Sequence, residues 1–164
     1  MEENMKKALV VYFIKYGSAK KYAEWITEEL DADIFSINSI QQLELSKYNI
    51  IILGCSLYPE TNKCIKGFVE NLRKIKDKKI IIFTCGAANV SKPENRDNIN
   101  KRFENIIPKN FFDNIKMFYF RGTLDYSLMS IKHRIMMSFM KKMVKSKKEQ
   151  DEDDKLLLET YGKR

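Results

Sequence analysis

The sequence predicts one doubly wound α/β domain, in which helices cover both faces of a five-stranded parallel sheet. Several of its apolar runs are continuous Val, Ile and Leu rather than alternating, which is typical of strands buried on both faces of a sheet. Apolar residues at helical spacing fill the segments between these runs, so strands and helices alternate along the chain. The predicted strands are residues 8–14, 32–37, 49–53, 79–83 and 115–120.

The segments between the predicted strands are expected to form helices of unequal length. Residues 19–30 and 64–75 each place an apolar stripe on one side of a helix. Residues 95–107 carry a third stripe, which stops at Pro108 because proline cannot continue a helix. The segment 39–43 is long enough for only a turn or two. Each helix is then a crossover connection between parallel strands.

Length and composition fit a single domain over residues 1–164. The chain is 44% hydrophobic, which is enough for a sizeable core, and 30 basic against 22 acidic residues give a formal charge of +8. No stretch approaches the ~18–20 apolar residues of a membrane span, and the charged start leads into a strand rather than a secretory signal. We therefore expect a cytoplasmic domain. The three cysteines have no CxxC spacing, so neither a disulfide framework nor a metal site is expected.

Glycines mark one end of the predicted sheet. Gly17, Gly54, Gly86 and Gly122 lie just after predicted strands one, three, four and five. Ligands of open parallel sheets bind outside the carboxyl ends of the strands, where a residue without a side chain lets the backbone approach the ligand. The glycines therefore indicate a ligand site at this edge, although each could also simply make a tight turn.

The loop after the first strand suits a single phosphate group. Residues 14–20 read Ile-Lys-Tyr-Gly-Ser-Ala-Lys and lead directly into the first helix. The N-terminus of a helix presents unpaired N–H groups and a partial positive charge, and Lys15 and Lys20 could add to that charge. The dinucleotide pattern G-x-G-x-x-G and the P-loop pattern G-x-x-x-x-G-K-[ST] are both absent. The loop therefore favours one phosphate over a dinucleotide.

Three segments resemble the FMN-binding regions of the flavodoxin family. Residues 11–23 resemble the family's phosphate loop, residues 48–58 its third strand with the flavin-flanking loop after it, and residues 84–89 its second flavin-flanking loop. The resemblance implies a flavodoxin-like sheet of strand order 2-1-3-4-5 and FMN as cofactor, with the flavin carrying the chemistry and no catalytic side chain. The cofactor-binding residues that it implies are Lys15, Tyr16, Gly17, Ser18, Ala19, Lys20, Ser56, Leu57, Tyr58, Cys85, Gly86, Ala87, Ala88 and Asn89.

Two features depart from the family pattern. The hydroxyl positions that the family uses on the phosphate fall here on Ile14 and Ala19, which leaves Ser18 and the backbone N–H groups of the loop. The last helix of the family, which packs on the sheet, has no clear counterpart before Arg164. Either the chain is truncated or another element covers that face of the sheet.

The end of the chain resembles one branch of the family. Residues 120–126, followed by a basic, methionine-rich helical insert at about 127–148, are similar to the menaquinone-dependent protoporphyrinogen oxidases and their relatives. This resemblance implies an FMN-dependent oxidoreductase that passes electrons to a quinone. Two alternatives remain: a soluble electron-transfer protein, against which the charge of +8 argues, and a non-redox interaction module that has lost FMN.

The predicted insert helix has several possible partners. Leu128 to Lys148 contains no acid and no proline, and its apolar residues recur at helical spacing. The stripe either packs on the sheet or contacts an apolar substrate, such as a quinone or porphyrin, or the anionic inner face of a membrane. Nucleic acid is not expected as a partner, because interleaved aromatics and a recognisable nucleic-acid fold are absent.

A few single residues carry weaker signals. His133 lies in the basic helix and is expected to pack rather than to catalyse, since no Ser or Cys nucleophile accompanies it in the sequence. Tyr58 is expected to stack on the flavin ring, and Trp25 is expected in the core. Cys55 and Cys85 end strands that are neighbours in the expected order, so a redox-sensitive pair is one interpretation.

Overall fold

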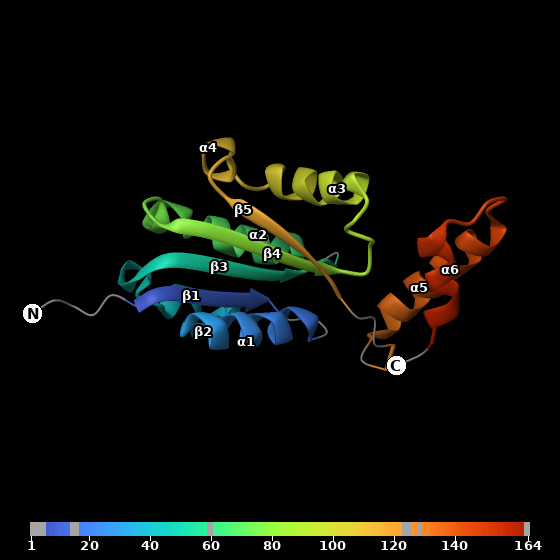
Figure 1. Ribbon diagram of the computed structural model, residues 1–164, viewed down its shortest axis with the longest axis horizontal. Coiled ribbons are helices and arrows are strands. Elements are labelled where there is room, and N and C mark those ends of the chain that lie inside the picture. Colours follow the sequence, from blue (N-terminus) through green and yellow to red (C-terminus); the bar gives the residue numbers. More distant parts are fainter. Residues whose placement is uncertain (1–5, 14–16, 59–60, 123–125, 128, 163–164) are drawn as a thin grey trace, which may run out of the picture.

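The computed structural model describes residues 6–13, 17–58, 61–122, 126–127 and 129–162, and in these it confirms the predicted fold class. Five parallel strands form one sheet in the order β2-β1-β3-β4-β5 (Figure 1). This is the strand order of the flavodoxin-like fold. The strands are β1 (Lys6–Phe13), β2 (Asp33–Ser36), β3 (Tyr48–Ser56), β4 (Lys79–Gly86) and β5 (Lys116–Arg121).

Strands β3 and β4 extend further toward the carboxyl edge of the sheet than the apolar runs predict. Gly54 lies inside β3, so the prediction that it follows the strand is wrong. It pairs with Tyr12 of β1 on one side and with Phe83 of β4 on the other. A Cβ atom at Gly54 would lie 2.3 Å from Cζ of Phe83. Close packing of this ring against the backbone therefore explains the glycine.

The connecting helices agree with the prediction except in the crossover between β3 and β4. The predicted helix 64–75 is two pieces, α2 (Thr61–Val69) and the 3₁₀ segment η3 (Leu72–Ile75). Asn71 is buried between them, and its side-chain amide donates a hydrogen bond of 3.0 Å to the carbonyl of Gly67. This bond satisfies a carbonyl at the end of α2, where the helix stops. The other connections are α1 (Ser18–Leu30), η1 (Ile37–Gln42), η2 (Leu45–Lys47), α3 (Pro93–Glu104) and α4 (Lys109–Phe112).

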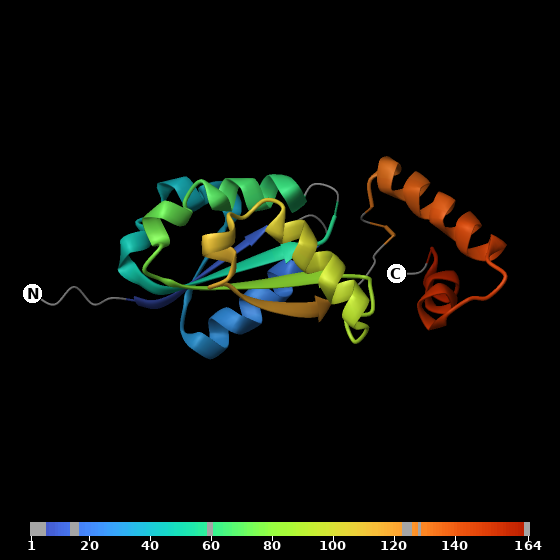
Figure 2. The same cartoon turned by 90° about the horizontal axis from the view of Figure 1, so that it is seen from above.

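The two faces of the sheet are covered unequally. One face packs against α2, α3 and the 3₁₀ segments in a large core that includes Phe68 and Phe103. On the other face a smaller core, with Val10 and Phe83, lies under α1 (Figure 2). Parallel sheets normally have both faces covered by helices. Phe118 of β5 nevertheless remains 42% exposed on the α1 side.

The prediction that Trp25 lies in the core is wrong, because this side chain is 57% exposed. Its ring meets Tyr22 edge-on with the centroids 5.4 Å apart, and Tyr22 in turn stacks on Phe120 of β5 at 4.7 Å. Phe118 pairs with Phe83 and lies on the same face of the sheet as Phe120. We call Tyr22, Trp25, Phe118 and Phe120 the aromatic patch.

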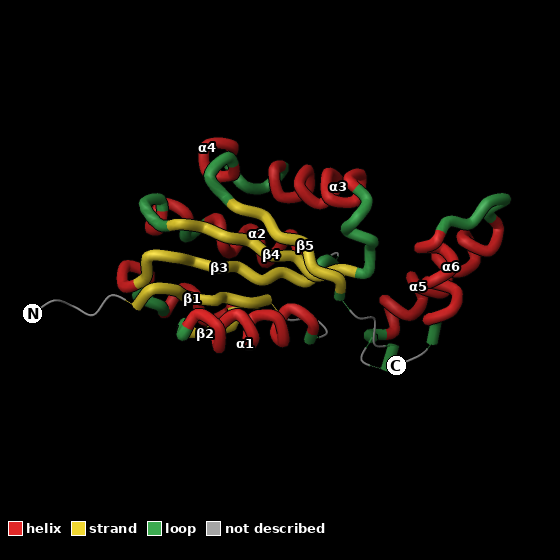
Figure 3. Tube along the Cα trace, viewed as in Figure 1, coloured by secondary structure: helices red, strands yellow, loops and turns green. Residues whose placement is uncertain are grey.

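A helical hairpin follows β5 and lies beyond the carboxyl end of the sheet (Figures 1 and 3). It consists of α5 (Ile131–Ser146), which is the predicted basic helix, and α6 (Glu152–Thr160), which the sequence pattern did not predict. A capping box between Asp151 and Asp154 begins α6. The helix α5 packs on α6 rather than on the sheet, contrary to the first of its expected arrangements. The core of the hairpin is Tyr126, Met129 and Met137, with Leu157 and Tyr161 packed against it.

Tyr48 links the start of β3 to β2 and makes the stability of the fold decrease at alkaline pH. Its buried hydroxyl donates a hydrogen bond of 2.7 Å to Oδ2 of Asp33. Burial, and then this bond, raise the pKa of Tyr48 to about 12, so the folded state favours the neutral phenol. The resulting stability is complete below the ordinary pKa of 10.0 and is lost as the pH rises through about 12.

We therefore expect the urea midpoint of unfolding to fall as the pH is raised from ~9 to ~12. Tyr48→Phe should remove part of this fall, because the variant has no phenol to ionise at this position. The measurement is urea unfolding of both proteins across that pH range. An equally steep fall in the variant would contradict the assignment.

Candidate functional site at the carboxyl edge of the sheet

The strands β1, β3 and β4 lie side by side, so three loops follow them at the carboxyl edge of the sheet. The first loop leads from β1 to Gly17, the second begins at Ser56 and the third begins at Gly86. The backbone N–H of Leu57 donates a hydrogen bond of 2.8 Å to the carbonyl of Cys85, which joins the second loop to the end of β4. The hairpin lies at this same end of the sheet (Figure 1). The structure thus brings the loop after β3 into direct contact with the end of β4.

The start of α1 is shaped for an anion. Gly17 has φ 96° and ψ −28°, a left-handed conformation that favours glycine, and no side-chain hydrogen bond caps the helix there. The first helical bond runs from the N–H of Lys21 to the carbonyl of Gly17, 3.1 Å. The amides of the first turn therefore have no helical carbonyl to bond and point out of the helix end, where the helix dipole is positive.

The other predicted residues of this loop differ in their surroundings. Lys15 and Tyr16, together with Ile14, lie outside the described residues. Lys20 is exposed and pairs with Glu24 at 3.4 Å, so part of its charge is already balanced. The side chain of Ala19 is completely buried in the core under α1, so only its backbone can serve a ligand at the edge. Ser18 is half-buried at the first position of the helix.

The loop after β3 is held by a network of hydrogen bonds. The N–H of Tyr58 donates to Oγ1 of Thr61 at 2.8 Å, and that hydroxyl donates to the carbonyl of Ser56. The guanidinium of Arg102 on α3 donates to the carbonyl of Tyr58, and its Nε donates to Oδ1 of Asn62 at 2.8 Å. Burial lowers the pKa of Arg102 from its usual high value. Thr61 on α2 and Arg102 on α3 thus position Tyr58, and neither is among the site residues predicted from the sequence.

The ring of Tyr58 contacts the hairpin. Its centroid lies 5.5 Å from that of His133 on α5, with the ring planes tilted by 34°. His133 is buried, which agrees with the packing role expected for it. The side chain expected to stack on a flavin is thus also the contact between the β3 loop and the insert helix. The stacking of Tyr58 on a flavin itself stays a prediction.

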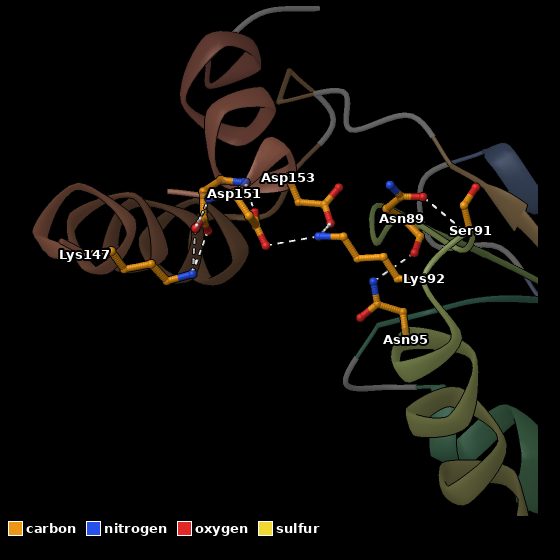
Figure 4. Close-up of polar contacts among 8 residues, drawn as sticks. Asn89, Ser91, Lys92, Asn95, Lys147, Asp151 and Asp153 are labelled. Carbon is orange, nitrogen blue, oxygen red and sulfur yellow. Dashed lines mark hydrogen bonds and ion pairs between the residues drawn. The ribbon is translucent and has the colours of Figure 1, made fainter. Parts of the chain in front are cut away.

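The loop after β4 depends on small residues. A Cβ atom at Gly86 would lie 2.9 Å from Cδ1 of Leu57, and the carbonyl of Gly86 accepts a hydrogen bond of 2.8 Å from the N–H of Gly122. Asn89 shapes the next turn, because its Oδ1 accepts from the N–H of Ser91 at 3.0 Å (Figure 4). Ala87 and Ala88 lie between these two fixed points and leave space in front of the loop.

An ion-pair network attaches the hairpin to this loop (Figure 4). Nζ of Lys92 lies 3.0 Å from Oδ2 of Asp151 and 2.8 Å from Oδ2 of Asp153. These two carboxylates, Asp153 first, hold the pKa of Lys92 above its usual value. The N–H of Asp154, and then Lys92, hold the pKa of Asp151 below its usual value. The hairpin is therefore held near the β4 loop by charged contacts that lie at the surface.

A cavity of about 410 Å³ lies between the β4 loop and the hairpin. Its floor includes Ala87, Ala88 and Arg121 from the domain, and its walls are largely the apolar side chains of α5 and α6. The sequence analysis predicted the two alanines but missed Arg121, whose only signal is its place at the end of β5. The hairpin residues that line the cavity are Met140, Met143, Val144, Lys147, Asp153, Asp154, Leu156, Leu157 and Thr160.

The interpretation of Cys55 and Cys85 as a redox pair is wrong. Cys55 faces the large core and Cys85 faces the core under α1, so their side chains lie on opposite sides of the sheet. Burial raises the pKa of the Cys85 thiol to about 12. We expect iodoacetamide at pH ~8 to leave Cys85 unlabelled in the folded protein and to label it in urea, because only the thiolate reacts. Peptide mass spectrometry reads the result, and labelling of Cys85 without urea would contradict it.

In the ranges that the structure describes, no helix combines the length and apolarity that a membrane crossing needs. No group of three or more His, Cys, Asp or Glu side chains in those ranges could hold a metal ion.

Strand order and loop placement define a doubly wound domain of the flavodoxin class. More narrowly, the Flavodoxin domain family matches residues 9–151, and the chain belongs to that family. Over 82 residues the chain is 32% identical to an uncharacterised protein of Methanocaldococcus jannaschii. That match covers 49% of this chain and 55% of the relative, so the chain spans about half the length of the curated relative it matches.

Solved structures with a similar fold have low sequence identity to this chain. One is a flavoprotein from Lactobacillus acidophilus in complex with FMN, at 17% identity and a TM-score of 0.47, covering 71% of this chain and 92% of that one. Another is oxidised flavodoxin 2 from Bacillus cereus, at 18% identity and a TM-score of 0.49, covering 83% of this chain and 99% of that one.

Proposed function

We propose that this chain is an FMN-binding electron-transfer protein, with the cofactor along the carboxyl edges of β1, β3 and β4. The observation that carries the proposal is the start of α1. It lies beside the point where the strand order reverses, between β1 and β3, which is where ligands bind in this class of sheet. Gly17 opens the helix there in a conformation that only glycine adopts easily.

The phosphate end of the site fits FMN through its backbone. The amides of the first turn of α1 supply donors, and the thirteen-residue helix supplies the partial positive charge. The side chain of Ala19 is buried, so the position that carries a hydroxyl in the family contributes only its N–H here. Binding should therefore depend on the geometry of Gly17 more than on side-chain hydroxyls.

The ring end of the site fits a flat aromatic group. Leu57 and Tyr58 follow β3, and Ala87 and Ala88 follow β4 and line the cavity. When bound, the flavin would supply the electron-accepting and electron-donating chemistry. The protein's part is to hold the ring: Arg102 and Thr61 fix the Tyr58 loop, and Gly86 lets Leu57 pack close.

A second candidate function is an oxidoreductase of the protoporphyrinogen oxidase type that passes electrons to a quinone. The cavity of about 410 Å³ favours it, because it adjoins the β4 loop and most of its lining surface is apolar. Two cations line it, Arg121 and Lys147, and Lys147 is paired with Asp154 at 2.8 Å. Apolar walls beside Arg121 suit an apolar ring compound that carries an acidic group. A protein that only docks partner proteins at the flavin edge has no need for such a cavity.

The first experiment is an absorption spectrum of the purified protein, followed by titration with FMN and with riboflavin. We expect saturable binding of FMN and at least ~10-fold weaker binding of riboflavin, which lacks the phosphate. Equal affinities would mean that α1 does not hold a phosphate. If neither FMN nor riboflavin bound, the non-redox interaction module would remain as the function of this protein.

A second experiment separates the two redox functions. The FMN-loaded protein is mixed with protoporphyrinogen and a menaquinone analogue, and porphyrin fluorescence is followed. Turnover that Arg121→Gln weakens would support the oxidoreductase. The absence of turnover in a protein that binds FMN would support electron transfer to a protein partner.

A further inference from the structure

Two apolar surfaces of this chain have no partner within the described residues. One is the aromatic patch on the half-covered face of the sheet. The other is a stripe on α5 formed by Ile131, Ile135 and Phe139, which are 76%, 66% and 64% exposed. The spacing of four residues places the three on one side of the helix. The opposite side of α5, with His133 and Met137, is the buried one.

We propose that the α5 stripe of one copy of this chain packs on the aromatic patch of a second copy, so that the protein is a symmetric dimer. Each copy supplies one stripe and one patch, and a two-fold axis then forms two identical contacts. This interface goes beyond the proposed electron-transfer function and does not depend on FMN.

The helix that carries the stripe and the edge strand that carries half of the patch are similar in length. The sixteen residues of α5 are about 24 Å long, and the six residues of β5 span about 20 Å. A helix on this part of the sheet would also complete the two-sided coverage that parallel sheets normally have. In this chain the half-covered face therefore has the size and the apolar character for one additional helix.

Opposite charges lie beside the two surfaces, and exposed Lys21 and Lys116 also border the patch. Exposed Glu28 and Glu29 follow Trp25 on α1, three and four residues along the helix. Exposed Lys132 and Lys142 border the α5 stripe, and α5 contains no acid. Contact between the surfaces would therefore pair acids of one copy with lysines of the other.

The arrangement of the hairpin favours a second copy over the same chain. Lys92 and Tyr58 hold the hairpin at the carboxyl edge, through Asp151, Asp153 and His133. In two views the hairpin stands beyond the end of the sheet and away from the face that α1 covers (Figures 1 and 2). From there α5 can reach another molecule without breaking these contacts.

An anionic membrane is the competing partner for α5, and the patch argues against it. Membrane contact would use the stripe and its lysines, but it would leave the aromatic patch without a partner. The neighbouring Glu28 and Glu29 would also be repelled by an anionic surface.

Sedimentation of the full chain without FMN, over a range of protein concentrations, tests the proposal. We expect a dimer whose dissociation constant rises at least ~10-fold in Phe118→Lys and in Phe139→Glu. Phe35→Lys is the matched control, because Phe35 is 37% exposed on the opposite edge strand, β2, and should leave the dissociation constant unchanged. Circular dichroism checks that each variant is folded. Because Phe139 is exposed, Phe139→Glu is not expected to unfold the protein.

Cysteine cross-linking identifies the contact. Trp25→Cys and Phe139→Cys are made in separate chains with Cys64→Ser, mixed and oxidised, and a disulfide-linked pair of the two chains is expected. A third protein carries both new cysteines in one chain. If a disulfide formed only within that chain, and none formed between the two separate chains, the proposal would be overturned. A monomer at every concentration would also overturn it, as would a dimer that Phe118→Lys and Phe139→Glu both leave intact. Binding of a monomer to anionic vesicles, lost in Phe139→Glu, would assign the stripe to a membrane instead.

Discussion

Gly54→Ala is expected to lower the free energy of unfolding by about 2–3 kcal/mol. The added Cβ would lie 2.3 Å from Cζ of Phe83 and 2.8 Å from its two Cε atoms. Phe83 is 1% exposed and packs against Phe120, so its ring has little room to move away. Urea unfolding at neutral pH measures the loss.

Gly67→Ala is the matched control for this prediction. Gly67 lies inside α2, and a Cβ atom there would meet nothing within 4 Å. We expect this variant to gain about 0.5–1 kcal/mol, since alanine favours the helix more than glycine does. The same substitution should thus have opposite signs at two positions. A Gly54→Ala protein as stable as the wild type would show that Phe83 repacks freely.

Gly17→Val is expected to weaken FMN binding at least ~10-fold and to cost about 1–3 kcal/mol of stability. A β-branched residue strongly disfavours φ 96°, so the backbone at the start of α1 must change. The amides that are proposed to hold the phosphate would then turn away from it. FMN titration and urea unfolding measure the two effects.

Gly162→Val separates strain from binding. Gly162 also has a left-handed φ, 81°, and a Cβ atom there would meet nothing within 4 Å. It follows α6 in the hairpin, away from the start of α1. We expect a similar loss of stability with FMN affinity unchanged. Equal losses of FMN affinity in both variants would mean that Gly17 acts only through stability.

The sequence was sufficient to predict the sheet because strands buried on both faces consist of continuous apolar residues. Continuous runs such as that of β3 have no alternative explanation once helical stripes flank them. The break at Asn71 could not be predicted in this way, since it depends on one buried side chain reaching the Gly67 carbonyl. The exposure of Trp25 was equally invisible, because it depends on which neighbours cover β5.

The predicted site was limited to loops that the family resemblance identifies. The chain pattern gave no indication that Arg102 on α3 reaches the loop after β3, forty-four residues earlier. It also did not reveal α6 or the cavity that this helix helps to form. One signal for α6 was available, the acids at 151 to 154, whose spacing allows a capping box.

The cavity beside the β4 loop has walls on two parts of the chain, the sheet domain and the hairpin. A molecule bound in it contacts both parts at once, so its affinity is thermodynamically linked to the position of the hairpin. The ion pairs of Lys92 that hold that position are exposed and therefore weakened by salt. Ionic strength thus acts on ligand affinity by weakening the ion pairs that hold the hairpin, and any affinity measured for this cavity is specific to the salt concentration used.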